Sequence, residues 1–222
     1  MPMDWTRQID AYCERTDFTF WAEPVNAATN AAFVLAALVM WRRCDGMPLG
    51  RALAAVLAVI GVGSFLFHTL ATEWASMADV LPILCFILLY VFVANRTYWG
   101  LGLWPALGLT ALFFPYAAVT GPLFGRLGWL GSSAGYAPVA LLILVYALAL
   151  VRRLPEVAAG LGLGVGLLAV SLTFRTIDLP VCAALPLGTH FVWHLLNAVM
   201  LGWMIEVYRQ HVRRASRGAV PG

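Results

Sequence analysis

Three of the four histidines in this chain occur in two short segments whose spacing suits a metal site. His68 follows Ser64 by four residues, and His194 follows His190 by four residues. Because four residues are just over one turn of an α-helix, each pair shares a helix face. Asp79 comes eleven residues after His68. Two such faces turned toward each other would gather imidazoles, a hydroxyl and a carboxylate. This set can hold a zinc ion with one coordination position left for water.

The histidines have two other interpretations. Each could be an interior histidine that hydrogen-bonds a neighbouring helix, because ionisable side chains in membrane helices face the bundle interior. They could also ligate a haem, since membrane cytochromes place histidines on facing helices. The close pair His190 and His194 on one helix favours a single metal ion over haem. We therefore predict His68, His190 and His194 as zinc ligands.

Asp79 and Ser64 each have two possible roles at such a site. Asp79 could ligate the metal itself. Hydrogen-bonded to a water on the metal, it would instead act first as a general base and then as a general acid. The Ser64 hydroxyl could donate to a developing oxyanion, or it could satisfy the backbone carbonyl four residues earlier. We predict both as catalytic residues, with the acid–base role for Asp79.

The elements that must position these residues are membrane helices. The chain has 222 residues, of which 62% are hydrophobic and 11% charged, with a mean hydropathy of +0.83. A soluble domain carries about 25% charged residues, so we interpret the chain as an integral membrane protein. The net charge of +3 does not indicate a nucleic-acid partner, because the arginines fall at the ends of apolar runs.

Seven apolar runs follow a polar, acidic head, and each is close to the ~20 residues that a helix needs to cross a bilayer. They occupy residues 25–41, 51–70, 78–94, 101–119, 134–151, 157–174 and 189–208. The predicted fold class is an all-α membrane protein with a seven-transmembrane-helix bundle. Its parts are an extracytoplasmic head over 1–24, a membrane domain over 25–208 and a basic tail over 209–222.

Arginine placement orients this bundle, because the cytoplasmic ends of membrane helices carry an excess of positive charge. With the N-terminus outside, ten arginines fall on the inner side and four on the outer side. The C-terminus is then cytoplasmic. In this topology His68, Asp79, His190 and His194 all lie toward the outer ends of their spans. We therefore predict one site at a common depth, near the extracytoplasmic face.

The acidic head is a second candidate site. It gathers hard oxygen donors of the kind that calcium prefers, namely Asp10, Glu14, Asp17, Glu23 and Asn26. The spacing does not match an EF-hand loop, and a solvated acidic tail is the alternative interpretation. Glu23 slightly favours a bound ion, because a bare carboxylate at the membrane border prefers a partner.

Taken together, these residues resemble the alkaline ceramidases, within a wider group of seven-helix membrane hydrolases. The resemblance runs from about residue 10 to residue 208. It is carried by Ser64-x3-His68-x10-Asp79, His190-x3-His194, Tyr12-Cys13-Glu14-Arg15, Phe20-Trp21-Ala22-Glu23-Pro24-Val25-Asn26-Ala27-x2-Asn30 and Ile177-Asp178-x3-Cys182. The combined spacing is specific, whereas any one piece alone would be weak.

The resemblance implies a zinc-dependent amidase that cuts the N-acyl bond of ceramide, or of a related N-acyl membrane lipid, and releases a fatty acid. It implies that the matching histidines bind zinc, and that Asp79 and Ser64 assist the water and the oxyanion. The family's calcium site uses acidic residues of the head. Glu14 and Glu23 match it directly, and the other head residues less so, because this head is shorter between Cys13 and Glu23. A seven-helix lipid receptor or sensor with a structural metal is the alternative functional class.

The resemblance also implies that Cys13 and Cys182 are paired. Both lie outside by the arginine count, where an oxidising compartment permits a disulfide; two unpaired thiols are the alternative. All 14 basic residues are arginine, which we interpret as bacterial. We expect the bacterial inner membrane, with the site toward the periplasm. Because many bacteria make no sphingolipid, the physiological N-acyl lipid stays open.

Overall fold

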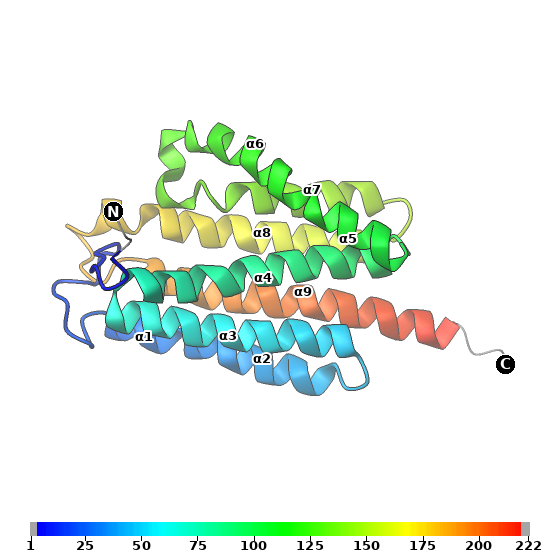
Figure 1. Ribbon diagram of the computed structural model, residues 1–222, viewed down its shortest axis with the longest axis horizontal. Coiled ribbons are helices and arrows are strands. Elements are labelled where there is room, and N and C mark those ends of the chain that lie inside the picture. The colour runs from blue at the N-terminus through cyan, green and yellow to red at the C-terminus, as the bar shows by residue number, and fades with distance from the viewer. Residues whose placement is uncertain (1–3, 219–222) are drawn as a thin grey trace.

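The computed structural model describes residues 4–218, in which helices are the regular elements and Gln8 and Thr72 form an isolated antiparallel bridge. The helices run alongside one another as a bundle (Figure 1). Their bounds are α1 Pro24–Thr29, α2 Ala31–Arg43, α3 Pro48–Leu70, α4 Glu73–Thr97, α5 Leu103–Ala111, α6 Phe113–Gly125, α7 Ala137–Leu150, α8 Pro155–Ile177 and α9 His190–Gly218, with 3-10 turns η1 Gly128–Ser133 and η2 Leu179–Val181.

Within the described residues, six helical stretches are long and apolar enough to cross a membrane. They are Pro24–Arg43 (α1 with α2), Pro48–Leu70 (α3), Glu73–Thr97 (α4), Leu103–Gly125 (α5 with α6), Pro155–Ile177 (α8) and His190–Arg217 (α9). The run predicted at 134–151 forms α7, whose 14 residues are fewer than a lone span needs. The all-α class is confirmed, and the apolar helices fit an integral membrane protein.

Proline sets the start of several of these helices. Pro24, Pro48 and Pro155 occupy the first positions of α1, α3 and α8. The fixed φ angle of proline suits the first helical turn, where its missing N–H removes no hydrogen bond. The apolar runs that follow continue as helix because, in a bilayer, a helix satisfies its own backbone groups.

A glycine lets α3 and α4 approach each other closely at the level of the predicted site. A Cβ atom at Gly63 would lie 2.0 Å from the carbonyl oxygen of Ala78 and 3.3 Å from the backbone nitrogen of Asp79. No residue with a side chain fits there without moving the helices apart. The close approach brings together the segments that carry Ser64 and Asp79.

The head is tied to the loop that leads into α9. A disulfide joins Cys13 to Cys182, whose Cα atoms are 5.4 Å apart, so the predicted pairing is confirmed. The Asp178 carboxylate accepts hydrogen bonds from the backbone N–H groups of Cys13, Thr189 and His190. It thereby satisfies backbone donors at the start of α9, which have no partner within the helix. Head, loop and α9 are thus held together at one end of the bundle.

The backbone just before α9 requires glycine. Gly188 has φ +65°, a left-handed conformation that other residues rarely adopt. A Cβ atom there would lie 2.2 Å from Asp178 Oδ1 and 2.6 Å from the Cβ of Cys13. The chain can therefore turn sharply into α9 and place His190 in its first turn.

Candidate metal centre

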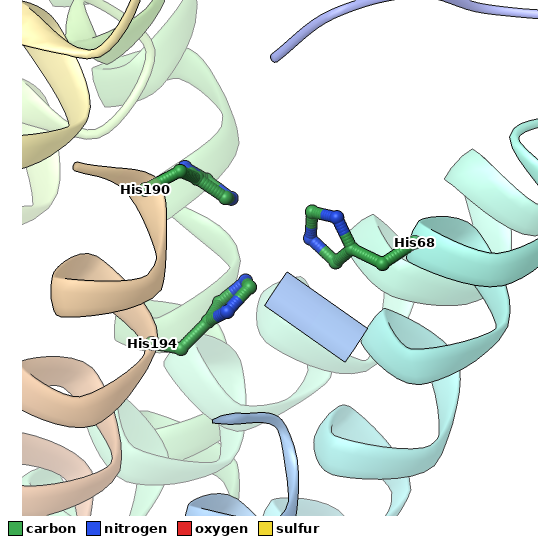
Figure 2. A group of neighbouring side chains, drawn as sticks. All are labelled: His68, His190 and His194. Atoms are coloured by element: carbon green, nitrogen blue, oxygen red, sulfur yellow. The ribbon is translucent and has the colours of Figure 1, made fainter. Parts of the chain in front are cut away.

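α3 and α9 bring three histidines to one point (Figure 2). His68 lies in the last turns of α3, and His190 and His194 lie in the first turns of α9. Their candidate ligand atoms all lie within 4.8 Å of one another, and all three side chains are buried. Among the described residues, no other group of three histidine, cysteine or acidic side chains comes this close together.

The ring nitrogens at this point lack hydrogen-bond partners. In the described part of the chain, Nε2 of His68, Nε2 of His194 and both ring nitrogens of His190 are buried and unpaired. Buried polar atoms nearly always find a partner, and leaving one unpaired is costly. Histidines that served only to join helices would have used these atoms. Three rings around one point also suit a single ion better than the opposed axial ligands of a haem.

Hydrogen bonds at the other nitrogen orient two of the rings. His68 Nδ1 lies 2.6 Å from Oε2 of Glu23, and His194 Nδ1 lies 3.0 Å from the hydroxyl of Thr29. A carboxylate can only accept, and the Thr29 hydroxyl already donates to a carbonyl of α1. Both Nδ1 atoms therefore carry the proton, which leaves the Nε2 lone pairs for a metal.

Aromatic rings hold the third histidine. Tyr12 stacks on His190 at a centroid distance of 3.7 Å, and Trp193 stacks on it at 5.0 Å. Burial raises the pKa of Tyr12 to about 12, although the charge of Arg175 opposes the shift, so its phenol stays neutral. His190 is therefore positioned by packing, while both of its nitrogens remain available.

Asp79 and Ser64 are buried on α4 and α3 but do not belong to the ligand group. Asp79 Oδ1 and Ser64 Oγ have no hydrogen-bond partner among the described residues. The Ser64 hydroxyl therefore does not bond the carbonyl four residues earlier, which was one of its two possible roles. Asp79 Oδ1 and Ser64 Oγ are therefore both free to meet water or substrate.

In the acidic head, the carboxylate of Glu14 serves the start of α1. It accepts the backbone N–H groups of Val25 at 2.7 Å and Asn26 at 2.8 Å. Burial raises the pKa of Glu14, and these two hydrogen bonds oppose that shift. The carboxylate thus replaces the missing partners of the first helical turn.

Glu23 has donors on both of its oxygens. Oε1 accepts the Arg15 Nε–H at 2.5 Å, while Oε2 accepts from Asn26 Nδ2 at 3.0 Å and from His68. Burial raises the pKa of Glu23, but the His68 hydrogen bond and the charge of Arg15 oppose this, and the pKa lies below its usual value. Arg15 also donates to the carbonyls of Asp17 and His68.

The remaining head residues are placed differently. Asp10 is exposed, and Asp17 is exposed with its carboxylate hydrogen-bonded to the backbone and hydroxyl of Thr19. Asn26 Oδ1 is buried and unpaired in the described structure. Of the five head residues, only Asn26 thus presents a buried oxygen that awaits a partner, so calcium remains a prediction.

Several residues around the centre had no role predicted from the sequence, although three of them belong to the motifs that carry the resemblance. Arg15, Thr29 and Asp178 act through hydrogen bonds to partners that are mostly distant in the sequence, and Tyr12 acts by stacking. Two signals could have pointed to them. Arg15 is a cation between the acids Glu14 and Asp17, and Thr29 is a polar side chain at the start of an apolar run.

The comparison with protein families agrees with this geometry. A family model described as Ceramidase matches residues 6–219, which include most of the head, the helices and every residue of the candidate centre. A search of curated proteins finds no match.

Proposed function

The chain belongs to the ceramidase family, and we propose that it is a zinc-dependent hydrolase cleaving the N-acyl bond of ceramide or a related N-acyl lipid. Membership of the family implies hydrolysis of an amide. The observation that carries the proposal is the buried group His68, His190 and His194, whose facing nitrogens are unpaired. Three protein ligands with an open fourth position are typical of catalytic zinc.

The side chains around this point have the roles that amide hydrolysis requires. A zinc ion held there would supply a Lewis acid and an activated water. Asp79 accepts a proton from the attacking water and then delivers it to the leaving amine nitrogen. Ser64 donates a hydrogen bond to the carbonyl oxygen as negative charge develops on it. Glu23 and Thr29 hold their histidines in the tautomer that keeps Nε2 free.

Apolar cavities beside the centre support a substrate with a long chain. One cavity lies against Tyr136 and Trp193, the second of which stacks on His190. It shares Ile87 and Met200 with another apolar cavity, which extends along α4, α7 and α9. A hydrocarbon chain in this path would have one end beside Trp193, which stacks on His190, and the scissile amide would lie just beyond that end.

A lipid receptor with a structural metal is less well supported. Structural zinc sites are closed by four protein ligands, and Asp79 would have to be the fourth. The ligand group found among the described residues consists of three histidines and does not include Asp79. The open position therefore favours catalysis.

We also propose the full topology, with α7 as a short seventh span, the head periplasmic and the C-terminus cytoplasmic in a bacterial inner membrane. The arginine bias supports this orientation. Single cysteines introduced at exposed loop positions test it. In intact cells, Arg126→Cys should react with a membrane-impermeant thiol reagent and Asp45→Cys should not. The reverse pattern would invert the topology.

Calcium at the head is a separate proposal. It is supported by the buried, unpaired Oδ1 of Asn26 and by the buried carboxylates of Glu14 and Glu23. An ion there would have to share both carboxylates with N–H donors, including those of Arg15. Calcium is therefore expected to add only a little stability to this hydrogen-bonded group, because Arg15 already supplies a positive charge within it.

Mass spectrometry of lipids tests the hydrolase directly. Purified zinc-loaded protein is incubated with a mixed pool of N-acyl lipids, and Asp79→Asn protein serves as the control. We expect free fatty acid and the matching amine lipid to appear only with the wild type. Wild-type protein that carries zinc yet leaves the whole pool intact would rule out the proposed hydrolysis.

A further inference from the structure

Arg175, near the end of α8, lies in a cage of aromatic rings. Its guanidinium carbon is 5.6 Å from the ring centroid of Tyr12, 5.2 Å from that of Tyr136 and 5.1 Å from that of Trp193. These rings come from the head, the residue before α7 and the first turns of α9. Aromatic faces at such distances stabilise a cation. Segments that are far apart in the sequence thus fix one positive charge in place.

One edge of this guanidinium is unused. Nη1 donates to the hydroxyl of Tyr12 at 3.1 Å. Nε is buried and has no partner, and Nη2 donates no hydrogen bond to any described residue. No described carboxylate forms an ion pair with Arg175; the Asp79 carboxylate attracts it only from a longer distance. The Nε–Nη2 edge is the one that pairs side by side with the two oxygens of a carboxylate.

The same cage forms part of the metal centre and of the apolar cavity. Tyr12 and Trp193 stack on His190, and Tyr136 and Trp193 line the cavity next to it. A chain that reaches Tyr136 and Trp193 in the cavity would therefore end against rings that contact both His190 and Arg175. The end of a fatty acid produced by amide hydrolysis is a carboxylate, whereas the N-acyl substrate is neutral at that position.

We propose that Arg175 binds the carboxylate of the released fatty acid through its Nε–Nη2 edge, an inference that rests on the proposed hydrolysis. The match is chemical, because the two N–H donors of this edge would pair with the two equivalent oxygens of a carboxylate in a site walled by aromatic rings. The protein should then prefer a free fatty acid over a neutral lipid of equal chain length. It should also be inhibited by its own product.

Equilibrium binding of palmitate and cetyl alcohol tests the assignment, because the two ligands share a chain and differ in the charged end group. The zinc-loaded full chain in lipid nanodiscs should bind palmitate about tenfold or more tightly than the alcohol, since charged hydrogen bonds are lost with the alcohol. In Arg175→Gln this preference should fall to a few-fold. Arg175→Lys keeps the charge without the paired donors, and its preference should lie between the two.

Two controls separate binding from folding. Arg213→Gln removes an exposed arginine at the opposite end of α9 and should leave the preference unchanged. Zinc content and melting temperature are measured for every variant. If Arg175→Gln does not fold, Arg175→Lys carries the test. Undiminished preference for palmitate in a folded Arg175 variant would overturn the proposal and assign the carboxylate to the metal.

The outcome is independent of the hydrolase assay, because binding needs no turnover. Palmitate preference that depends on Arg175, in a protein that cleaves no N-acyl lipid, would support the anion site and overturn the proposed hydrolysis. If the protein cleaves N-acyl lipids but its preference for palmitate is unchanged in Arg175 variants, the hydrolysis is supported and the anion site at Arg175 is overturned.

Discussion

The histidine centre and the acidic head lie at the same end of the bundle, and both are rich in groups that bind metals. They differ in how those groups are satisfied. At the centre, the facing nitrogens of His68, His190 and His194 have no partners among the described residues. In the head, both oxygens of Glu14 and of Glu23 accept hydrogen bonds.

This difference separates a site that awaits a ligand from one that holds the fold together. A buried polar atom without a partner is costly, and a metal ion, which the three histidines could hold, would remove that cost. A buried carboxylate with donors on both oxygens is already paired and can act as a clamp. Residue type alone indicated metal in both regions, whereas the pairing distinguishes them.

The largest effect should come from removing a ligand of the centre. His194→Ala should reduce zinc from about one per chain to almost none and abolish hydrolysis, because only two protein ligands remain. The control is His211→Ala, which removes the fourth histidine; its ring lies by the carbonyl of Thr97, far along α9. Metal analysis measures the change. Zinc retained in His194→Ala would contradict the assignment of His194 as a ligand.

A slightly smaller effect is expected where the residue acts on protons rather than on the metal. Asp79→Asn should keep zinc and lose about 10²- to 10⁴-fold in turnover, the usual contribution of a general acid–base group. Zinc content and turnover are measured on the same sample. Loss of zinc in Asp79→Asn would make Asp79 a ligand, and full activity would remove it from the mechanism.

The disulfide tests how firmly the head is attached. The residues it joins are 169 apart in sequence, and in the chain-entropy model such a closure stabilises by about 4–5 kcal/mol. Replacing both Cys13 and Cys182 by serine should therefore lower the denaturant midpoint clearly. Cys85→Ser is the matched control, because Cys85 is a free, exposed thiol. Equal midpoints for the two variants would show that the bond adds no stability.

Glu23 links the two regions, so its removal should act on the centre from a distance. Glu23→Gln weakens the hydrogen bond that orients His68, and such losses typically reduce metal affinity about 10- to 100-fold. Competition with a zinc chelator measures the change. Asp17→Asn, an exposed acid of the same head, should have no effect. If both variants bind zinc like the wild type, the head and the centre are independent.

Calcium should give the smallest effect, because the head already contains Arg15 as a cation. A calcium-selective chelator should lower the melting temperature slightly. The free energy of unfolding lost with a weakly bound extracytoplasmic calcium ion is on the order of 1 kcal/mol. Glu23→Ala should abolish this response, whereas Glu73→Ala, an acid outside the head, should preserve it. If chelation leaves the wild-type melting temperature unchanged, no calcium ion is bound at Glu14 and Glu23, and Arg15 is the cation that pairs with Glu23.

Much of the fold could be predicted from the sequence, because helices in a bilayer are recognised by apolar length. The runs at 51–70 and 157–174 correspond closely to α3 and α8. Local backbone chemistry modified other runs. The first divides into α1 and α2 at Asn30, and the run at 134–151 is shortened because residues 134–136 form a turn between η1 and α7.

What the sequence alone determined is therefore local. Helical periodicity places His190 and His194 on one face, and the run lengths place His68 at a matching depth. Tertiary structure decided which polar groups are satisfied. Thr29 meets His194 across 165 residues, Arg15 meets the carbonyl of His68 across 53, and Arg175 is caged by rings from distant segments. Hydrogen bonds and ring contacts depend on distances of a few ångströms in space, and those distances exist only once the helices have packed.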